Sequence, residues 1–223
     1  TGYSLSDADW DAVLDALKEH AKTGKRISIL VDIAYIEYSG TKDETRAFME
    51  KFADLPANLF IMFAFSMSKG YTMYGQRTGA IVGLSAHKEI VEEFKTVSSF
   101  SSRGTWSNIN RGAMAALAKI YRDAALRAQF EKERESLYQM IRERGVIFME
   151  EAKACALNAL PYKAGFFLSI PAADPVAVCD RLHDDFIFPV PLKKGVRVAV
   201  CAVPAKKMRG MAGKIKKAWD AAR

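Results

Sequence analysis

A lysine preceded by two serines and followed by an arginine stands at the end of an apolar run. Ser66, Ser68 and Lys69 follow residues 59–65, and Arg77 comes eight residues after the lysine. A lysine amine just past a strand can form a Schiff base with an aldehyde. Two hydroxyls and a guanidinium can hold a phosphate group on the same molecule. We therefore expect these residues to bind an aldehyde that carries a phosphate.

A carboxylate ends the preceding apolar run. Asp32 closes residues 27–33, whose continuous apolar character is typical of a strand covered on both faces of a parallel sheet. Ligands of open α/β sheets bind outside the carboxyl ends of the strands, so Asp32 and Lys69 should project into one crevice. Taken alone, an aspartate at the end of a strand is more often a turn former or a helix cap.

An arginine also interrupts an apolar strand near the end of the chain, in Gly-Val-Arg-Val-Ala-Val-Cys. A buried arginine is costly unless it is paired, so Arg197 needs an anionic partner. Two alternatives remain open at this point. Arg197 binds a substrate carboxylate, or it forms a structural ion pair with Asp180, Asp184 or Asp185.

With Asp32 before it and Arg197 after it, the Ser-x-Ser-Lys motif with Arg77 resembles the pyridoxal-phosphate aminotransferases of the aspartate/aromatic class, class I/II and fold type I. The resemblance covers only the C-terminal portion of that family's chain. It implies pyridoxal 5′-phosphate as cofactor, bound as a Schiff base to Lys69, the catalytic residue. It also implies amino-group transfer between an amino acid and a 2-oxo acid, with dicarboxylic or aromatic amino acids favoured.

The resemblance assigns roles to the residues around the cofactor. Asp32 would face the pyridine nitrogen, and Tyr35 would hydrogen-bond the phenolic oxygen. Arg77 and the motif's serines would hold the phosphate, Ser66 in preference to Ser68. In the other part of the chain, Arg197 would bind the substrate's α-carboxylate.

A second arginine bears on the substrate. The segment from Arg103 to Ser107 and Asn108 is similar to an Arg-x-x-x-Ser-Asn segment of these enzymes, which reaches into the neighbouring subunit's site. The resemblance implies that Arg103 meets the side-chain carboxylate of a dicarboxylic substrate and that Ser107 assists phosphate binding. It therefore also implies a homodimer. The segment departs from the family's pattern at residues 109–110, where prolines are common, and the alternative is a hinge loop with solvated side chains.

The order of patterned segments predicts an α/β chain of two parts. Residues 1–110 would be the C-terminal part of the large, mostly parallel cofactor-binding domain, and residues 111–223 an interdomain helix with a smaller α/β domain. Helices are expected at Asp7–Ala21, with Ser6 as N-cap, and at residues 43–53, 86–97, 111–144, 174–184 and 204–222. Strands are expected at residues 27–33, 58–65, 79–84, 166–170, 186–190 and 196–203.

The first part holds few strands for a covered parallel sheet, and its first strand has no earlier partner. An apolar strand on an open edge favours aggregation, so we expect another segment to cover it. In the family an Asn-Pro-x-Gly turn stands here, of which only Thr1-Gly2 remains. The N-terminal half is therefore expected elsewhere, in the same or another chain, and this fragment is expected to be inactive alone.

Composition limits the other function classes. The net charge of +7 is concentrated near the C-terminus, on the wet face of an amphipathic helix and without a recognition motif, so no nucleic-acid partner is expected. Three cysteines lack metal-ligand spacing, which argues against a disulfide framework or a zinc site and for a reducing cytoplasm. No apolar run is long enough to span a membrane.

Two alternative functions share most of these residues. A pyridoxal-phosphate-dependent β-elimination, as in a carbon–sulfur lyase, would use the same aspartate, tyrosine, lysine and arginine. A non-catalytic aminotransferase-like sensor domain of a transcription regulator would keep the lysine and turn over poorly. An N-terminal winged-helix segment would identify that second alternative.

Overall fold

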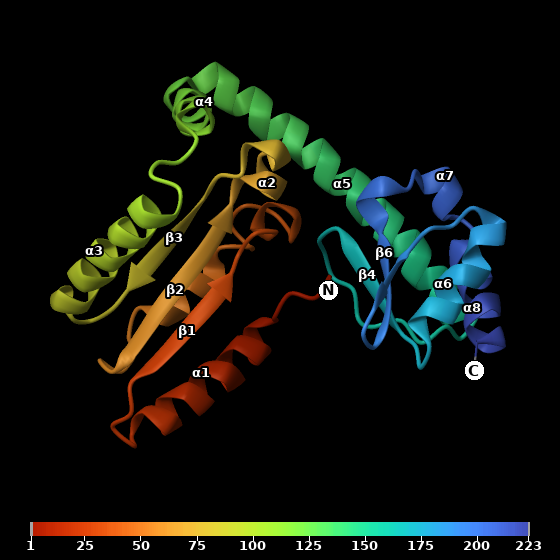
Figure 1. Ribbon diagram of the computed structural model, residues 1–223, viewed down its shortest axis with the longest axis horizontal. Helices are drawn as coiled ribbons and strands as arrows, with labels where there is room; N and C mark the ends of the chain where they lie inside the picture. The colour runs from red at the N-terminus through yellow and green to blue at the C-terminus, as the bar shows by residue number, and fades with distance from the viewer. Residues whose placement is uncertain (1, 223) are drawn as a thin grey trace. The chain divides into compact units, whose positions relative to one another are not determined.

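The computed structural model describes residues 2–222 and divides into two compact units (Figure 1). One unit is Leu5–Arg134, which carries the lysine motif. The other comprises residues 2–4 and 135–222, which include Arg197. The division falls between Arg134 and Glu135, within a helix, whereas the sequence-based division at 110/111 followed the start of the helical segment.

The first unit is built on a three-stranded sheet in the order β1-β2-β3, with β1 at Ile27–Asp32, β2 at Leu59–Ser66 and β3 at Gly79–Leu84. β1 and β2 are parallel, with Asp32 opposite Ala64, and β3 is antiparallel to β2. The mixed α/β class is as the sequence predicts. Within this unit the parallel character is confined to the β1–β2 pair, because β3 returns directly from β2.

One face of the sheet carries the unit's largest core. Helix α1, Asp7–Ala21, begins at the predicted N-cap Ser6. The structure shows a capping box there, in which Ser6 Oγ accepts from the Asp9 amide and the Asp9 carboxylate accepts from the Ser6 amide. Its apolar side packs with the 3₁₀ helix η2 (Ala47–Phe52) against the strands. The buried members of this core are Leu14, Ala21, Val31, Phe52, Leu59 and Ile61.

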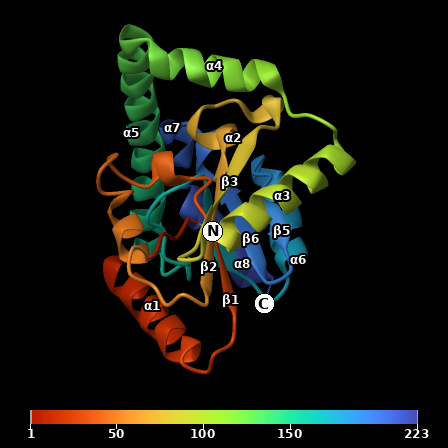
Figure 2. The same cartoon turned by 90° about the vertical axis from the view of Figure 1, so that its left-hand side faces the viewer.

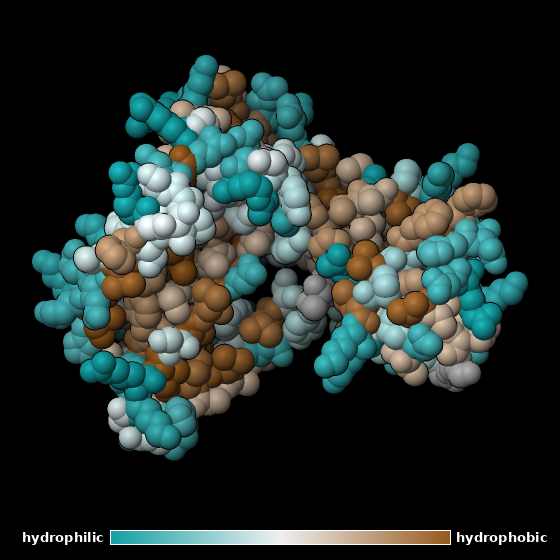
Figure 3. All heavy atoms as spheres, viewed as in Figure 1, coloured by the Kyte–Doolittle hydropathy of each residue, from teal (hydrophilic) through white to brown (hydrophobic). Residues whose placement is uncertain are grey.

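The other face of β1 is not covered by the part of the chain that the structure describes. Side chains alternate along β1, and Leu30 is 61% exposed while Val31, on the core face, is 6% exposed. The prediction that residues 27–33 are covered on both faces is therefore wrong for this chain. Figure 3 shows apolar side chains gathered over this sheet, and Ile81 and Val82 of β3 are also exposed.

The remaining elements of this unit connect and flank the strands. They are η1 (Ile36–Tyr38), α2 (Met67–Gly70), η3 (Tyr74–Gln76), α3 (Lys88–Thr105) and α4 (Arg111–Arg122). The α-helix expected at 43–53 is instead a turn followed by the 3₁₀ helix η2 at Ala47–Phe52. The expected helix at 86–97 continues as α3 through the serine-rich segment to Thr105, where side-chain hydroxyls such as that of Thr105 donate back to helix carbonyls.

The single helix expected at 111–144 is wrong, because the segment forms two helices. α4 ends at Arg122, and α5 runs from Ala124 to Ala154. Asp123 has an extended backbone, and its carboxylate accepts from the amides of Ala125 and Leu126, as an N-cap does. Figure 2 shows the sharp change of direction between the two helices.

The second unit has an antiparallel sheet in the order β4-β6-β5, with β4 at Phe167–Pro171, β5 at Val190–Leu192 and β6 at Gly195–Ala199. Its other elements are α6 (Pro175–Leu182), η4 (His183–Asp185), η5 (Val200–Ala202), α7 (Ala205–Met208) and α8 (Met211–Ala221).

Three expectations for this unit need correction. The strand expected at 196–203 ends at Ala199, because Val200–Ala202 form the 3₁₀ helix η5. The strand expected at 186–190 begins only at Val190, because Phe186 adopts a left-handed backbone conformation (φ 55°) that ends η4. The helix expected at 204–222 breaks at Gly210, which has φ 79° and whose amide donates to the Glu151 carboxylate at 2.8 Å. Among the described residues, none of the helices is both long and apolar enough to span a membrane.

Candidate functional site

The predicted lysine lies at the carboxyl end of the parallel strand pair. β2 ends at Ser66, and α2 starts with the next residue, so Lys69 sits on the first turn beyond the sheet. Asp32 ends the neighbouring strand on the same edge, and its exposed carboxylate accepts from the Ala34 amide at 2.9 Å. The strand ends therefore present a carboxylate and an amine at one edge of the sheet, as the sequence predicts.

Hydroxyl and guanidinium groups gather directly beside this turn. Ser66 Oγ accepts from the Ser68 amide at 3.2 Å and caps α2. Arg77 Nη1 donates to Ser68 Oγ at 3.2 Å and to the Tyr74 carbonyl at 2.8 Å. The structure thus brings Arg77 and Ser68 into direct contact, with Ser66 one residue from the turn. A cluster of donors of this kind suits a phosphate group.

Arg77 is held in an unusual backbone conformation. Its φ is 50°, in the left-handed region that side chains other than glycine seldom adopt. The loop that carries it is tied down by Asn110, whose side-chain amide donates to the Gln76 carbonyl at 3.3 Å while its oxygen caps α4. These contacts fix the guanidinium at the turn in spite of the backbone cost.

Two aromatic rings face the lysine. The half-buried Lys69 Nζ lies 4.5 Å from the centroid of the Tyr74 ring and 5.8 Å from that of Tyr35. Arg77 Cζ lies 5.3 Å from the same Tyr74 ring, which therefore contacts both cations. The sequence analysis assigned a role to Tyr35 and missed Tyr74. Its position, five residues after the lysine and three before the arginine, is the signal that could have found it.

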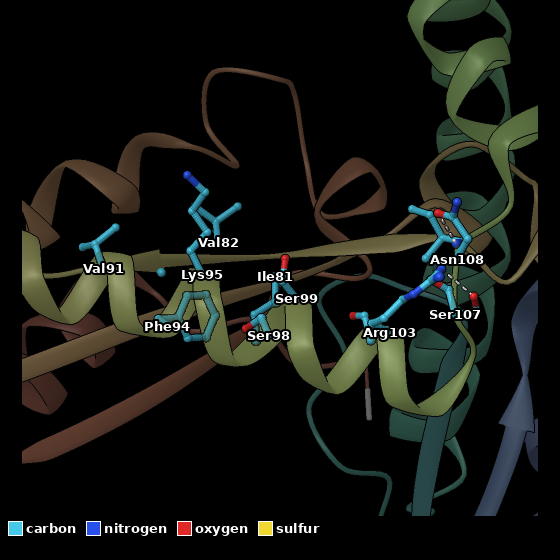
Figure 4. Close-up of a pocket in the computed structure, with 13 residues that line it drawn as sticks. Ile81, Val82, Val91, Phe94, Lys95, Ser98, Ser99, Arg103, Ser107 and Asn108 are labelled. Atoms are coloured by element: carbon cyan, nitrogen blue, oxygen red, sulfur yellow. Dashed lines mark hydrogen bonds between the residues drawn. The ribbon is translucent and has the colours of Figure 1, made fainter.

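Arg103, predicted to bind the side-chain carboxylate of a substrate, belongs to a separate cluster in this unit. Arg103, near the end of α3, donates to Ser107 Oγ at 2.7 Å, and both side chains are exposed. They lie at one end of a groove of about 780 Å³ between β3 and α3, whose middle is lined by Val82 and Phe94 (Figure 4). Within residues 2–222, no hydrogen bond or ion pair joins this cluster to the lysine turn.

Two buried tyrosines, Tyr71 and Tyr38, pack near the turn that carries Lys69. Burial raises the pKa of Tyr71, and its hydroxyl shares a 2.6 Å hydrogen bond with that of Tyr121 on α4. The Tyr71 ring stacks on Phe130 of α5 at 5.0 Å. Burial likewise raises the pKa of Tyr38, against an opposing effect of the Arg134 guanidinium. These phenols are therefore neutral packing groups at ordinary pH.

Arg197 lies on β6 in the other unit. Its guanidinium stacks on the Phe167 ring, with Cζ 4.4 Å from the centroid, and its buried Nε has no hydrogen-bond partner. Among the described residues, none of the aspartates considered as ion-pair partners contacts its side chain, and Asp185 instead pairs with Lys214 at 3.0 Å. The orphaned Nε is a donor aimed at no protein acceptor.

No group of three or more histidine, cysteine, aspartate or glutamate side chains in residues 2–222 is arranged to hold a metal ion. All three cysteines are free thiols, and burial raises the pKa of Cys179 and of Cys201.

The sequence profile described as "Aminotransferase class I and II" matches residues 1–215. The chain belongs to this family. Among curated proteins, it is 26% identical over 142 residues to an aromatic-amino-acid aminotransferase of Pseudomonas aeruginosa, covering 63% of this chain and 34% of that protein. It is also 26% identical over 158 residues to an aspartate aminotransferase of the same organism, covering 69% of this chain and 37% of that protein.

Solved structures of aminotransferases share the fold. An aminotransferase from Anaerococcus prevotii DSM 20548 superposes with a TM-score of 0.94 at 41% identity, covering 99% of this chain and 54% of that one. An aromatic-amino-acid aminotransferase from Burkholderia pseudomallei, covalently bound to pyridoxal phosphate, gives a TM-score of 0.76 at 24% identity, covering 98% and 53%. The chain thus spans about half the length of these structures and about a third of the curated relatives.

Proposed function

We propose that the protein containing this chain transfers amino groups between an amino acid and a 2-oxo acid, with pyridoxal 5′-phosphate bound to Lys69. One observation carries the proposal. The Lys69 amine stands at the carboxyl end of a parallel strand pair, beside Ser68 and Arg77, which are already in contact at 3.2 Å. Family membership over residues 1–215 supports the same reaction class.

The donor set fits the cofactor. Arg77 and the hydroxyls of Ser66 and Ser68 match the charge and geometry of a phosphate, and the left-handed backbone at Arg77 is a strain that a bound anion would repay. Asp32 stands at the neighbouring strand end, where its carboxylate can face a pyridine nitrogen. The orphaned Nε of Arg197 fits a substrate carboxylate, which would satisfy the unmade hydrogen bond.

When bound, pyridoxal phosphate supplies an electrophilic aldehyde and an electron-accepting ring. The chain's residues do the rest. Lys69 Nζ would hold the cofactor covalently, and its amine, when free, would take up and return the proton of the substrate Cα. Asp32 would keep the ring nitrogen protonated, and the Tyr35 hydroxyl would donate to the phenolic oxygen. Arg197 orients the α-carboxylate.

The proposal extends to dicarboxylic or aromatic amino acids as substrates and to a homodimer. Arg103 is exposed and hydrogen-bonded only within its own loop, so its guanidinium keeps donors for a carboxylate supplied by a substrate. In a homodimer, Arg103 and Ser107 would serve the neighbouring subunit's site. Relatives named aromatic-amino-acid and aspartate aminotransferases agree with this choice of substrates.

The test uses the full-length protein that contains this chain. It is incubated with pyridoxal phosphate, reduced with borohydride, digested and mapped by mass spectrometry. Label at Lys69 in a one-to-one ratio, absent in Lys69→Ala and unchanged in the exposed-surface control Lys42→Ala, is the expected result. Label spread over several lysines would refute the assignment.

Turnover then separates the reaction classes. A separate sample, loaded with pyridoxal phosphate but not reduced, is assayed with aspartate, tyrosine or phenylalanine and 2-oxoglutarate, and glutamate is measured. Release of ammonia and pyruvate from a β-substituted alanine, without glutamate formation, would indicate the elimination reaction instead. Specific labelling without either activity would indicate a sensor domain. Residues 1–223 expressed alone are expected to show no turnover.

A further inference from the structure

A buried carboxylate lies between two arginines next to the lysine turn. Glu37, in η1, is 6% exposed, and Arg134, on α5, is 9% exposed. One Glu37 oxygen accepts from Arg46 Nη2 at 2.5 Å, and the other accepts from Arg134 Nη1. Arg134 Nη1 also lies 3.4 Å from the Glu37 carbonyl oxygen. Glu37, Arg46 and Arg134 have no role in the proposed mechanism.

The stem of the same side chain touches the residue after the lysine. A Cβ placed on Gly70 would lie 2.5 Å from Glu37 Cγ and 3.1 Å from Glu37 Cβ, so position 70 has room only for glycine while Glu37 keeps its place. Gly70 follows Lys69 directly in α2, and Glu37 follows Tyr35 by two residues in η1. The Glu37 side chain therefore links the turn that carries Tyr35 to the turn that carries Lys69.

Packing alone does not require an ionic group here. An apolar side chain of similar volume would fill the space beside Gly70 without the desolvation cost of a buried carboxylate and guanidinium. What the ion cluster adds is direction, because two charge-assisted hydrogen bonds fix both oxygens of Glu37. Arg134, on α5, supplies one of these hydrogen bonds from a position 97 residues further along the chain.

We propose that Glu37, clamped by Arg46 and Arg134, is a positioning residue that holds the Tyr35 turn against the Lys69–Gly70 turn. It sets the spacing between the Tyr35 phenol and the Lys69 amine, now 5.8 Å from Nζ to the ring centroid. The inference rests on the proposed function, since spacing matters only if both groups serve the cofactor. Misplacement of about 1 Å at such a site can cost about 10²-fold in rate.

The experiment is made on the full-length protein loaded with pyridoxal phosphate. The readouts are the pH midpoint of the visible absorbance of the lysine-bound cofactor, the kcat and KM of the half-reaction with an amino acid, and the urea unfolding midpoint. The variants are Glu37→Gln, Gly70→Ala and the double variant Glu37→Met with Arg134→Met, which removes both buried charges together. Gly213→Ala is the matched control, because a Cβ there meets nothing within 4 Å.

We expect a shifted absorbance midpoint and a kcat reduced at least tenfold in all three variants, with KM nearly unchanged and the control like wild type. The double variant should unfold at a urea concentration near that of wild type, which separates positioning from folding even if Glu37→Gln does not fold. If the double variant has the wild-type absorbance midpoint and kcat, the positioning role of Glu37 is overturned, while the proposed function still stands. Wild-type protein without label at Lys69 would overturn the proposed function and this inference with it.

Discussion

Replacing Arg197 by methionine should separate its binding role from its structural role. Methionine keeps much of the unbranched stem that packs in the sheet but removes the guanidinium. In the structure that guanidinium has a buried Nε without a partner and a stacking contact with Phe167 at 4.4 Å. Residues 2–222 offer it no carboxylate, so the substitution breaks no ion pair within this part of the chain.

The two structural terms can be compared. An unsatisfied buried donor costs about 1–3 kcal/mol, which the substitution would recover. A cation–π contact contributes about 0.5–2 kcal/mol, which it would lose. The free energy of unfolding of Arg197→Met should therefore lie between about 1 kcal/mol below and about 2.5 kcal/mol above that of wild type. Substrate affinity should respond very differently, because two charge-assisted hydrogen bonds to a carboxylate are worth at least about 3 kcal/mol, or roughly 10²-fold in affinity.

The assay measures both quantities on the full-length protein loaded with cofactor. Urea unfolding gives the stability, and spectroscopic titration with an amino acid gives the affinity. Arg181→Met, an exposed arginine on α6 of the same unit, is the control and should change neither. Strong destabilisation of Arg197→Met with unchanged amino-acid affinity would show that the arginine serves the fold, and the assignment would be abandoned.

Three further outcomes are expected. Arg77→Lys loses the bidentate fork at the turn, so affinity for pyridoxal phosphate should fall about tenfold in an equilibrium titration; an unchanged affinity would remove Arg77 from the phosphate site. Ile61→Ala, at a side chain that is 2% exposed in the core, should lower the free energy of unfolding by about 2–5 kcal/mol, and a loss under 1 kcal/mol would contradict the packing described. Burial raises the pKa of Tyr162 to about 12 from 10.0, so the unfolded chain loses this proton first and stability should fall as pH rises from 10 to 12. Urea midpoints of Tyr162→Phe should fall less over that range, and parallel curves would contradict the assignment.

Local signals predicted much of the fold. The N-cap residue Ser6 marks the start of α1, and the apolar runs mark β1 and β2, because these features depend on neighbours in the chain. The same runs placed Asp32 and Lys69 at one sheet edge, since parallel strands end together. The break between α4 and α5 at Asp123 was not predicted. The helix-capping contacts of Asp123 compete with a strongly helical composition on both sides, and composition alone favoured a continuous helix.

Features that depend on distant residues could not be predicted. Glu37 and Arg134 lie 97 positions apart, and nothing in their local sequence distinguishes them from solvated charges. Whether Arg197 had a protein partner likewise required the structure, because three aspartates stood within reach in sequence. The exposure of Leu30 depends on what covers β1, which periodicity within β1 cannot reveal.

The left-handed backbone at Arg77 has a consequence for laboratory evolution of this protein. A side chain other than glycine with φ near 50° costs about 1–2 kcal/mol, so a glycine or asparagine at this position would make the fold more stable. A selection that rewards thermal tolerance alone should therefore enrich such replacements and lose the guanidinium. Selection that also rewards growth dependent on the enzyme should keep the arginine, and position 77 would then show directly how strongly a library was selected for activity.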